Sequence, residues 1–124
     1  MLYTKQGKHH TKIGTEANED GFIKNGVGLH HRAIGILKDQ KDLEGFIKGL
    51  PVKTAGADND NIPDYAEVNV LSYDSDWHPG REIMVIFYVD GDDVVITESG
   101  DGGIDGFLTT KTTFADLKAA LAAL

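Results

Sequence analysis

The segment Glu82–Val89 most constrains the fold, because it is apolar on both of the faces that an extended chain presents. Successive side chains of a β-strand point to opposite faces of the sheet. One face would carry Ile83, Val85, Phe87 and Val89, and the other Met84, Ile86 and Tyr88. A strand without a polar face is normally central and covered on both sides. The sequence therefore predicts a sheet in which this segment has neighbours at both edges.

The surrounding pattern predicts an antiparallel meander of three or four strands over about residues 65–109. Tyr65–Tyr73 alternates between apolar and polar residues, and Asp90-Gly91 is a hairpin signal that leads into Asp92–Glu98. A glycine-rich turn then precedes a fourth predicted strand, Ile104–Thr109. Short apolar runs separated by turn residues are typical of strands joined by hairpins.

A first helix is predicted at about residues 40–50. Asp39 is placed to cap its first turn, and Gly49 or Pro51 is placed to end it. Four apolar residues recur at the spacing of one helical face: Leu43, Phe46, Ile47 and Leu50. Gly45 lies inside this helix, where glycine costs about 1 kcal/mol relative to alanine.

A second helix is predicted at about residues 113–124. Thr113 and Asp116 form a T-x-x-D pattern, in which the hydroxyl caps the first turn of the helix. A stripe of apolar residues follows at helical spacing: Phe114, Leu117, Leu121 and Leu124. With both helices packed on the meander, the fold class is α+β.

The N-terminal third is harder to interpret. Residues 1–21 are polar and are expected to form an arm, which is mobile in one interpretation, or an irregular hairpin. Asn25-Gly26 is a hairpin signal, and a strand is expected to continue through Leu29–Leu37. Residues 51–63 are expected to form a long loop. The length of 124 residues indicates a single domain.

Charge is sorted along the chain and limits the classes of partner. Residues 1–48 hold eight Lys/Arg and six Asp/Glu, whereas residues 49–124 hold four and fourteen. A field of one sign repels nucleic acid and attracts basic protein surfaces, so no direct nucleic-acid binding is expected. The longest apolar run, Ile83–Val89, is too short to span a bilayer, and no membrane association is expected. The start has no apolar leader and the chain has no cysteine, so a cytoplasmic location is expected.

The acidic turns are the main candidate interaction site. The five acidic residues that we assign to it are Asp90, Asp92, Asp93, Asp101 and Asp105. We expect the two turns to meet at one end of the sheet and to form a protein-binding patch. Trp77 and Arg81 lie in a further connection and are residue types favoured in interfaces. The alternative for Trp77 is that its side chain caps one end of the core.

A calcium site is the alternative function. Oxygen ligands at alternate positions suit Ca²⁺, and Asp58, Asp60 and Asp64 supply them. The segment 58–64 resembles the D-x-D-x-I-P-D tail of thrombospondin type 3 repeats, and that resemblance implies these three aspartates as ligands. Those proteins carry tandem copies and often cysteine, whereas this chain has one copy and no cysteine. The competing interpretation is a surface loop rich in turn residues.

An enzyme with a histidine site is the second alternative. If the first 37 residues formed one hairpin, His10 would face His31 across its strands; His30 and His78 are further candidates. Familiar catalytic motifs are absent, so the sequence favours a non-enzymatic protein. We predict a small acidic interaction module that binds a basic protein surface, of the kind found among inhibitors, immunity proteins and phage or mobile-element accessory proteins. No cofactor is expected apart from calcium, and self-association through strand Tyr65–Tyr73 or Ile104–Thr109 stays open.

Overall fold

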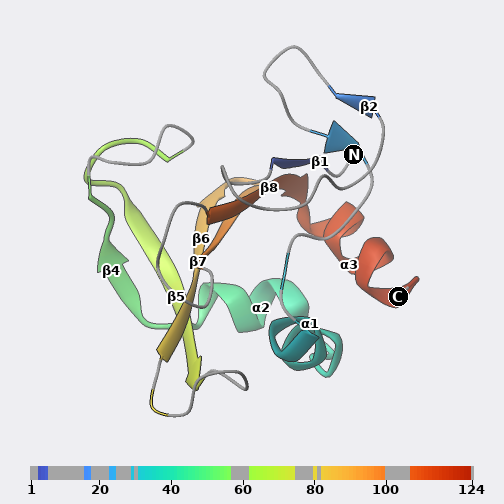
Figure 1. Cartoon of the computed structure of the whole chain (residues 1–124), viewed down its shortest axis with the longest axis horizontal. Coiled ribbons are helices and arrows are strands. Elements are labelled where there is room, and N and C mark those ends of the chain that lie inside the picture. Colours follow the sequence, from blue (N-terminus) through green and yellow to red (C-terminus); the bar gives the residue numbers. More distant parts are fainter. Residues whose placement is uncertain are drawn as a thin grey trace.

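The computed structural model describes residues 3–5, 16–17, 23–24, 29, 31–56, 62–74, 80, 82–99 and 107–123. The elements in these ranges are β1 (Tyr3–Lys5), β2 (Glu16–Ala17), β3 (Ile23–Lys24), α1 (His31–Lys38), α2 (Leu43–Lys48), β4 (Val52–Thr54), β5 (Glu67–Asp74), β6 (Glu82–Asp90), β7 (Asp93–Ser99), β8 (Phe107–Thr113) and α3 (Phe114–Ala122). The α+β class with an antiparallel sheet is confirmed (Figure 1).

The described strands form one sheet in the order β2-β3-β1-β8-β7-β6-β5-β4. Every neighbouring pair is antiparallel. The run from β5 to β8 is the meander that the sequence predicts, with neighbours in chain order. The sheet is wider than expected, because β4 pairs with the outer side of β5 and β1 pairs with the outer side of β8. Each of the two strands considered for self-association is paired on its outer side along three residues, Glu67–Asn69 in β5 and Thr109–Lys111 in β8.

Strand β4 corrects the predicted loop over residues 51–63 at Val52–Thr54, and residues 57–61 of that loop lie outside the described residues. Two contacts bring the chain after α2 alongside β5: the Val70 amide donates to the Pro51 carbonyl at 2.9 Å, and Asn69 Nδ2 donates to the Leu50 carbonyl at 3.0 Å. These contacts join residues far apart in sequence. A three-residue strand held by such contacts is too short to show an alternating pattern of its own.

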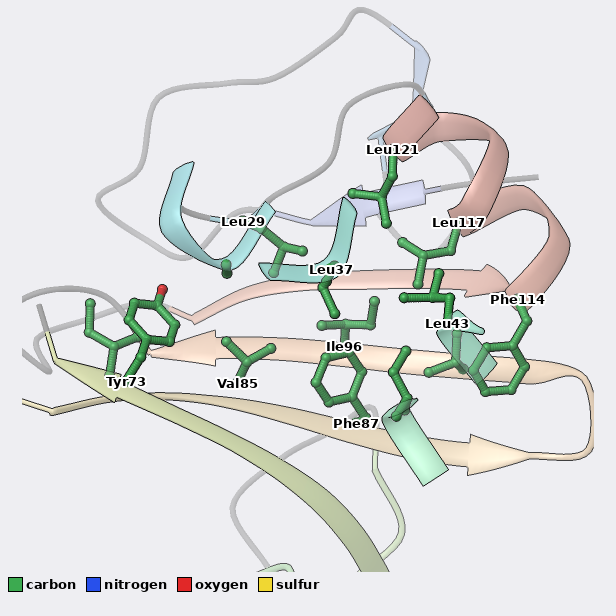
Figure 2. Packing of buried hydrophobic residues seen from close by; sticks show 14 residues of the cluster. Leu29, Leu37, Leu43, Tyr73, Val85, Phe87, Ile96, Phe114, Leu117 and Leu121 are labelled. Carbon is green, nitrogen blue, oxygen red and sulfur yellow. The ribbon is translucent and has the colours of Figure 1, made fainter. Parts of the chain in front are cut away.

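The central position of β6 is confirmed. It lies between β5 and β7, and Val85 and Phe87 are 0% exposed on the face that the helices cover. All three helices contribute to the cluster on this face (Figure 2). The helical members shown there include Leu37 from α1, Leu43 from α2 and Leu117 from α3.

The opposite face of the sheet carries a smaller cluster. Ile62, Val68 and Val70 are buried there, and the side chains packed against them include Ile86, Tyr88 and Val95. Met84, on the same face of β6, is 39% exposed. Among the described residues, Ile83, Val85 and Phe87 of β6 are buried on the helical face, whereas the other face of β6 is only partly covered.

Helix α1 replaces the strand expected over Leu29–Leu37. Leu29, Ala33 and Leu37 are buried and recur every four residues, which is the spacing of one face of a helix. Gly35 lies on the exposed side of α1. The helix begins at His31, so His31 does not take the strand position opposite His10 that a single hairpin over the first 37 residues would require, and His10 itself lies outside the described residues.

The start of the second helix differs from the prediction. Asp39 belongs to the end of α1, because its amide donates to the Gly35 carbonyl, and Gln40 Nε2 donates to the Ile36 carbonyl. The N-cap of α2 is Asp42, whose carboxylate accepts from the Gly45 amide at 3.0 Å. The predicted end at Gly49 is confirmed.

Helix α3 matches its prediction closely. Thr113 is the N-cap, and its hydroxyl accepts from the Asp116 amide at 3.2 Å. Phe114, Leu117 and Leu121 are buried against the sheet. Thr113 is also the last residue of β8, so the strand passes into the helix without a linker.

The Asp42 cap predicts the effect of substituting Gly45. A Cβ at Gly45 would collide with the Asp42 carboxylate. Gly45→Ala should therefore leave the free energy of unfolding nearly unchanged, since the gain in helix propensity and the lost cap are each about 1 kcal/mol. In an Asp42→Ala background the same substitution should stabilise by about 1 kcal/mol. Urea unfolding of the four proteins measures this coupling. A full gain in the wild-type background would contradict it.

Tyr65 predicts a second stability effect. It has φ 61° and is 71% exposed, in the turn that the Ala66 amide closes on the Pro63 carbonyl at 3.1 Å. A left-handed backbone costs an L-residue about 1 kcal/mol, and glycine avoids most of that cost. Tyr65→Gly should raise the free energy of unfolding by about 1 kcal/mol, whereas Tyr65→Ala keeps the strain and should not. Equal values for the two variants in urea unfolding would contradict the strain.

Candidate functional site

The turn between β6 and β7 carries three of the predicted acidic residues. Its two loop residues are Gly91 and Asp92, and Asp90 and Asp93 face one another as the last strand pair. Gly91 has φ 62°, and a positive φ at only the first loop position is characteristic of a type II′ hairpin. The prediction of a hairpin is confirmed, with the loop one residue later than expected.

The turn is held against the start of α3. The Phe114 amide donates to the Asp92 carbonyl at 3.1 Å, and Thr113 is the strand partner of Asp93. The first free amide of α3 is thus satisfied by the turn rather than by solvent. These contacts fix the direction of the turn relative to the helix.

The three carboxylates of the turn are a concentrated negative charge. Asp90, Asp92 and Asp93 are all exposed. The ion pair found within the described ranges joins Lys48 to Glu44 at 3.4 Å, and none of the three turn carboxylates forms one there. Like charges placed directly opposite on an antiparallel pair are destabilising, so the Asp90–Asp93 pair is unfavourable in isolation.

A hollow of about 410 Å³ lies beside Asp90 and Asp93 on the face opposite the helices. Three further side chains on this face also line the hollow: Tyr88, Val95 and Lys111. Tyr88 and Val95 are half-buried and belong to the smaller apolar cluster. The hollow therefore combines an aromatic ring and an aliphatic wall with two carboxylates and one ammonium group.

A second hollow, of about 540 Å³, lies on the helical side of the turn. Its charged lining residues are Lys41, Asp42, Glu44, Asp92 and Lys118. Here two ammonium groups stand among three carboxylates, and the Asp42 carboxylate already caps α2. The acidic turn lies between this mixed hollow and the one on the face opposite the helices, since Asp92 lines the former and Asp90 and Asp93 line the latter.

The other residues predicted for the interaction site lie outside the described ranges: Trp77, Arg81, Asp101 and Asp105. The strand order bears on the expectation that the two acidic turns share one end of the sheet. Ser99 and Phe107, which flank the second turn, pair at the end of β7 opposite Asp93. Seven strand residues span roughly 20 Å. The anchor points of the two turns are therefore separated by the length of β7.

The calcium hypothesis stays a prediction. Asp58 and Asp60 lie outside the described residues, and Asp64 is exposed in the turn that precedes β5. Within the described ranges, no three His, Asp or Glu side chains come together in an arrangement that could hold a metal ion. Of the histidine candidates, His30 and His78 also fall outside those ranges.

Comparison with known proteins adds no assignment: no family model, curated protein or solved structure matches this chain. None of the helices in the described ranges is both long enough and apolar enough to cross a bilayer.

Two neighbours of the acidic turn, Tyr88 and Lys111, were not among the predicted site residues. Tyr88 stands two residues before Asp90. Because side chains of a strand alternate between its two faces, the sequence alone places Tyr88 and Asp90 on the same face. The position of Lys111 depends on the register of β8 against β7, where it pairs with Val95. No local signal in the sequence sets that register.

The like-charge pair predicts a stabilising substitution. Asp93→Lys places an ammonium group opposite Asp90, and a favourable cross-strand pair is worth about 0.5 kcal/mol. The free energy of unfolding should rise by at least that amount at low salt, and less at high salt. Asp92→Lys makes the same change of charge in the loop, without a cross-strand partner, and is the control. An equal rise in both variants would show that overall charge, not the pair, is responsible.

Proposed function

We propose that the protein is a non-enzymatic interaction module that binds a basic protein surface through the β6–β7 turn. The observation that carries the proposal is the set of three exposed carboxylates, Asp90, Asp92 and Asp93, on a turn that α3 holds in place. None of them is neutralised by an ion pair within the described ranges.

Two physical properties support this role. A fixed turn loses little conformational freedom on binding, so more of the interaction energy appears as affinity. A concentrated charge also steers an oppositely charged partner and raises the association rate. The net charge of −8 for the whole chain acts in the same direction.

A peptide of six lysines tests the proposal with a defined probe. The triple variant Asp90→Asn, Asp92→Asn and Asp93→Asn should weaken binding roughly tenfold, if each lost contact is worth about 0.5 kcal/mol. The matched control removes three exposed charges elsewhere through Asp39→Asn, Glu67→Gln and Glu82→Gln. Both variants lose three negative charges, and calorimetric titration compares them. Equal weakening in both would show that net charge alone attracts the peptide and would overturn the turn as the site.

Salt provides an independent check on the wild-type protein. Exposed charges are screened over about 10 Å at 0.1 M salt, so affinity for the lysine peptide should fall steeply between about 0.05 M and 0.5 M salt. The same titration at several salt concentrations measures this slope. A flat profile would indicate that the peptide is held by apolar contacts instead.

A further inference from the structure

We infer that the hollow beside the β6–β7 turn receives an arginine side chain of the partner, with its guanidinium group against Tyr88 and the carboxylates of Asp90 and Asp93. The inference rests on the proposed function and names the group that the site recognises. It concerns the hollow on the face of the sheet opposite the helices, and not the mixed hollow beside α2.

The lining of the hollow matches the chemistry of a guanidinium group. Tyr88 is half-buried and lines the hollow together with Val95, so the ring and the aliphatic wall form an apolar side for the stem of a long side chain. A cation over an aromatic face is favoured electrostatically, and arginine also stacks on rings. The volume of about 410 Å³ is enough to hold a long side chain.

The two carboxylates of the hollow favour the binding of a cation. Asp90 and Asp93 face one another across the strand pair, and both line the hollow. A cation placed between them would replace repulsion by two attractive contacts. Lys111 adds one positive charge to the lining, so two negative charges stand against one. This balance favours a single cationic side chain over a doubly charged metal ion, which requires more oxygen ligands.

Arginine is favoured over lysine by geometry. A guanidinium group is planar, presents several donors in a fixed fork and is weakly hydrated, so it can bond two carboxylates while stacking on a ring. A lysine ammonium is a compact, strongly hydrated charge and gains less from the ring. The turn carboxylates alone attract both side chains, and Tyr88 is the group that distinguishes them.

Peptides of six arginines and six lysines test this preference at equal charge. The wild-type protein should bind the arginine peptide at least threefold more tightly than the lysine peptide. Tyr88→Leu should remove most of that ratio, and Tyr88→Phe should keep it, because the ring remains. Tyr65→Leu makes the same change at an exposed tyrosine outside the hollow and should leave the ratio unchanged.

Nuclear Overhauser contacts in the wild-type complex keep the test independent of folding defects in the variants. Contacts between the Tyr88 ring and the arginine Cδ protons are expected. If both peptides bind with equal affinity, or if Tyr88→Leu leaves the ratio intact, the arginine site is wrong while the acidic interaction module stands. If neither peptide binds to the wild-type protein, the proposed function fails, and the arginine site fails with it. Binding of the arginine peptide without contacts to Tyr88 would also overturn the site.

Discussion

The fold depends on the burial of β6 from its helical face. Val85 and Phe87 are completely buried there, and their contacts come from helices that precede and follow the meander in the chain. Emptying a buried phenylalanine site typically costs about 3–5 kcal/mol, which is a large part of the whole stability of a small domain. The helices have no other described apolar layer to pack on. Sheet and helices therefore form a single cooperative core around this strand.

The elements that could be predicted from sequence are those whose signal is local and strong. The continuous apolar run of β6 and the T-x-x-D pattern of α3 each lie within a short window and agree with the structure. Helix α1 was not predicted, because Gly35 interrupts the apolar pattern of its residues Ala33 and Leu37 and because a hairpin signal at Asn25-Gly26 lies close before it. Strand β4 could not be found at all, since Asn69 and Val70 hold it from a distant part of the chain.

The residues of the candidate site also differ in whether a local sequence signal predicts them. The carboxylates of the turn were predictable, because an Asp-Gly pair between two apolar runs is itself the signal of a hairpin. Lys111 was not predictable, because its place beside Val95 follows from strand register. The expectation that the two acidic turns share one end of the sheet stays a prediction, because Asp101 and Asp105 lie outside the described residues, but the strand residues that flank the two turns lie at opposite ends of β7. Asp93 and Ser99 mark those two ends in β7.

The direct passage from β8 into α3 has a mechanical consequence. Thr113 ends the strand and caps the helix, and the next amide holds the turn at Asp92. No linker separates the strand from the helix. A displacement of the β6–β7 turn is therefore transmitted directly to the first turn of α3. A fluorophore attached to the exposed Ala115 would therefore sense events at the tip, although it stands on a different layer of the protein.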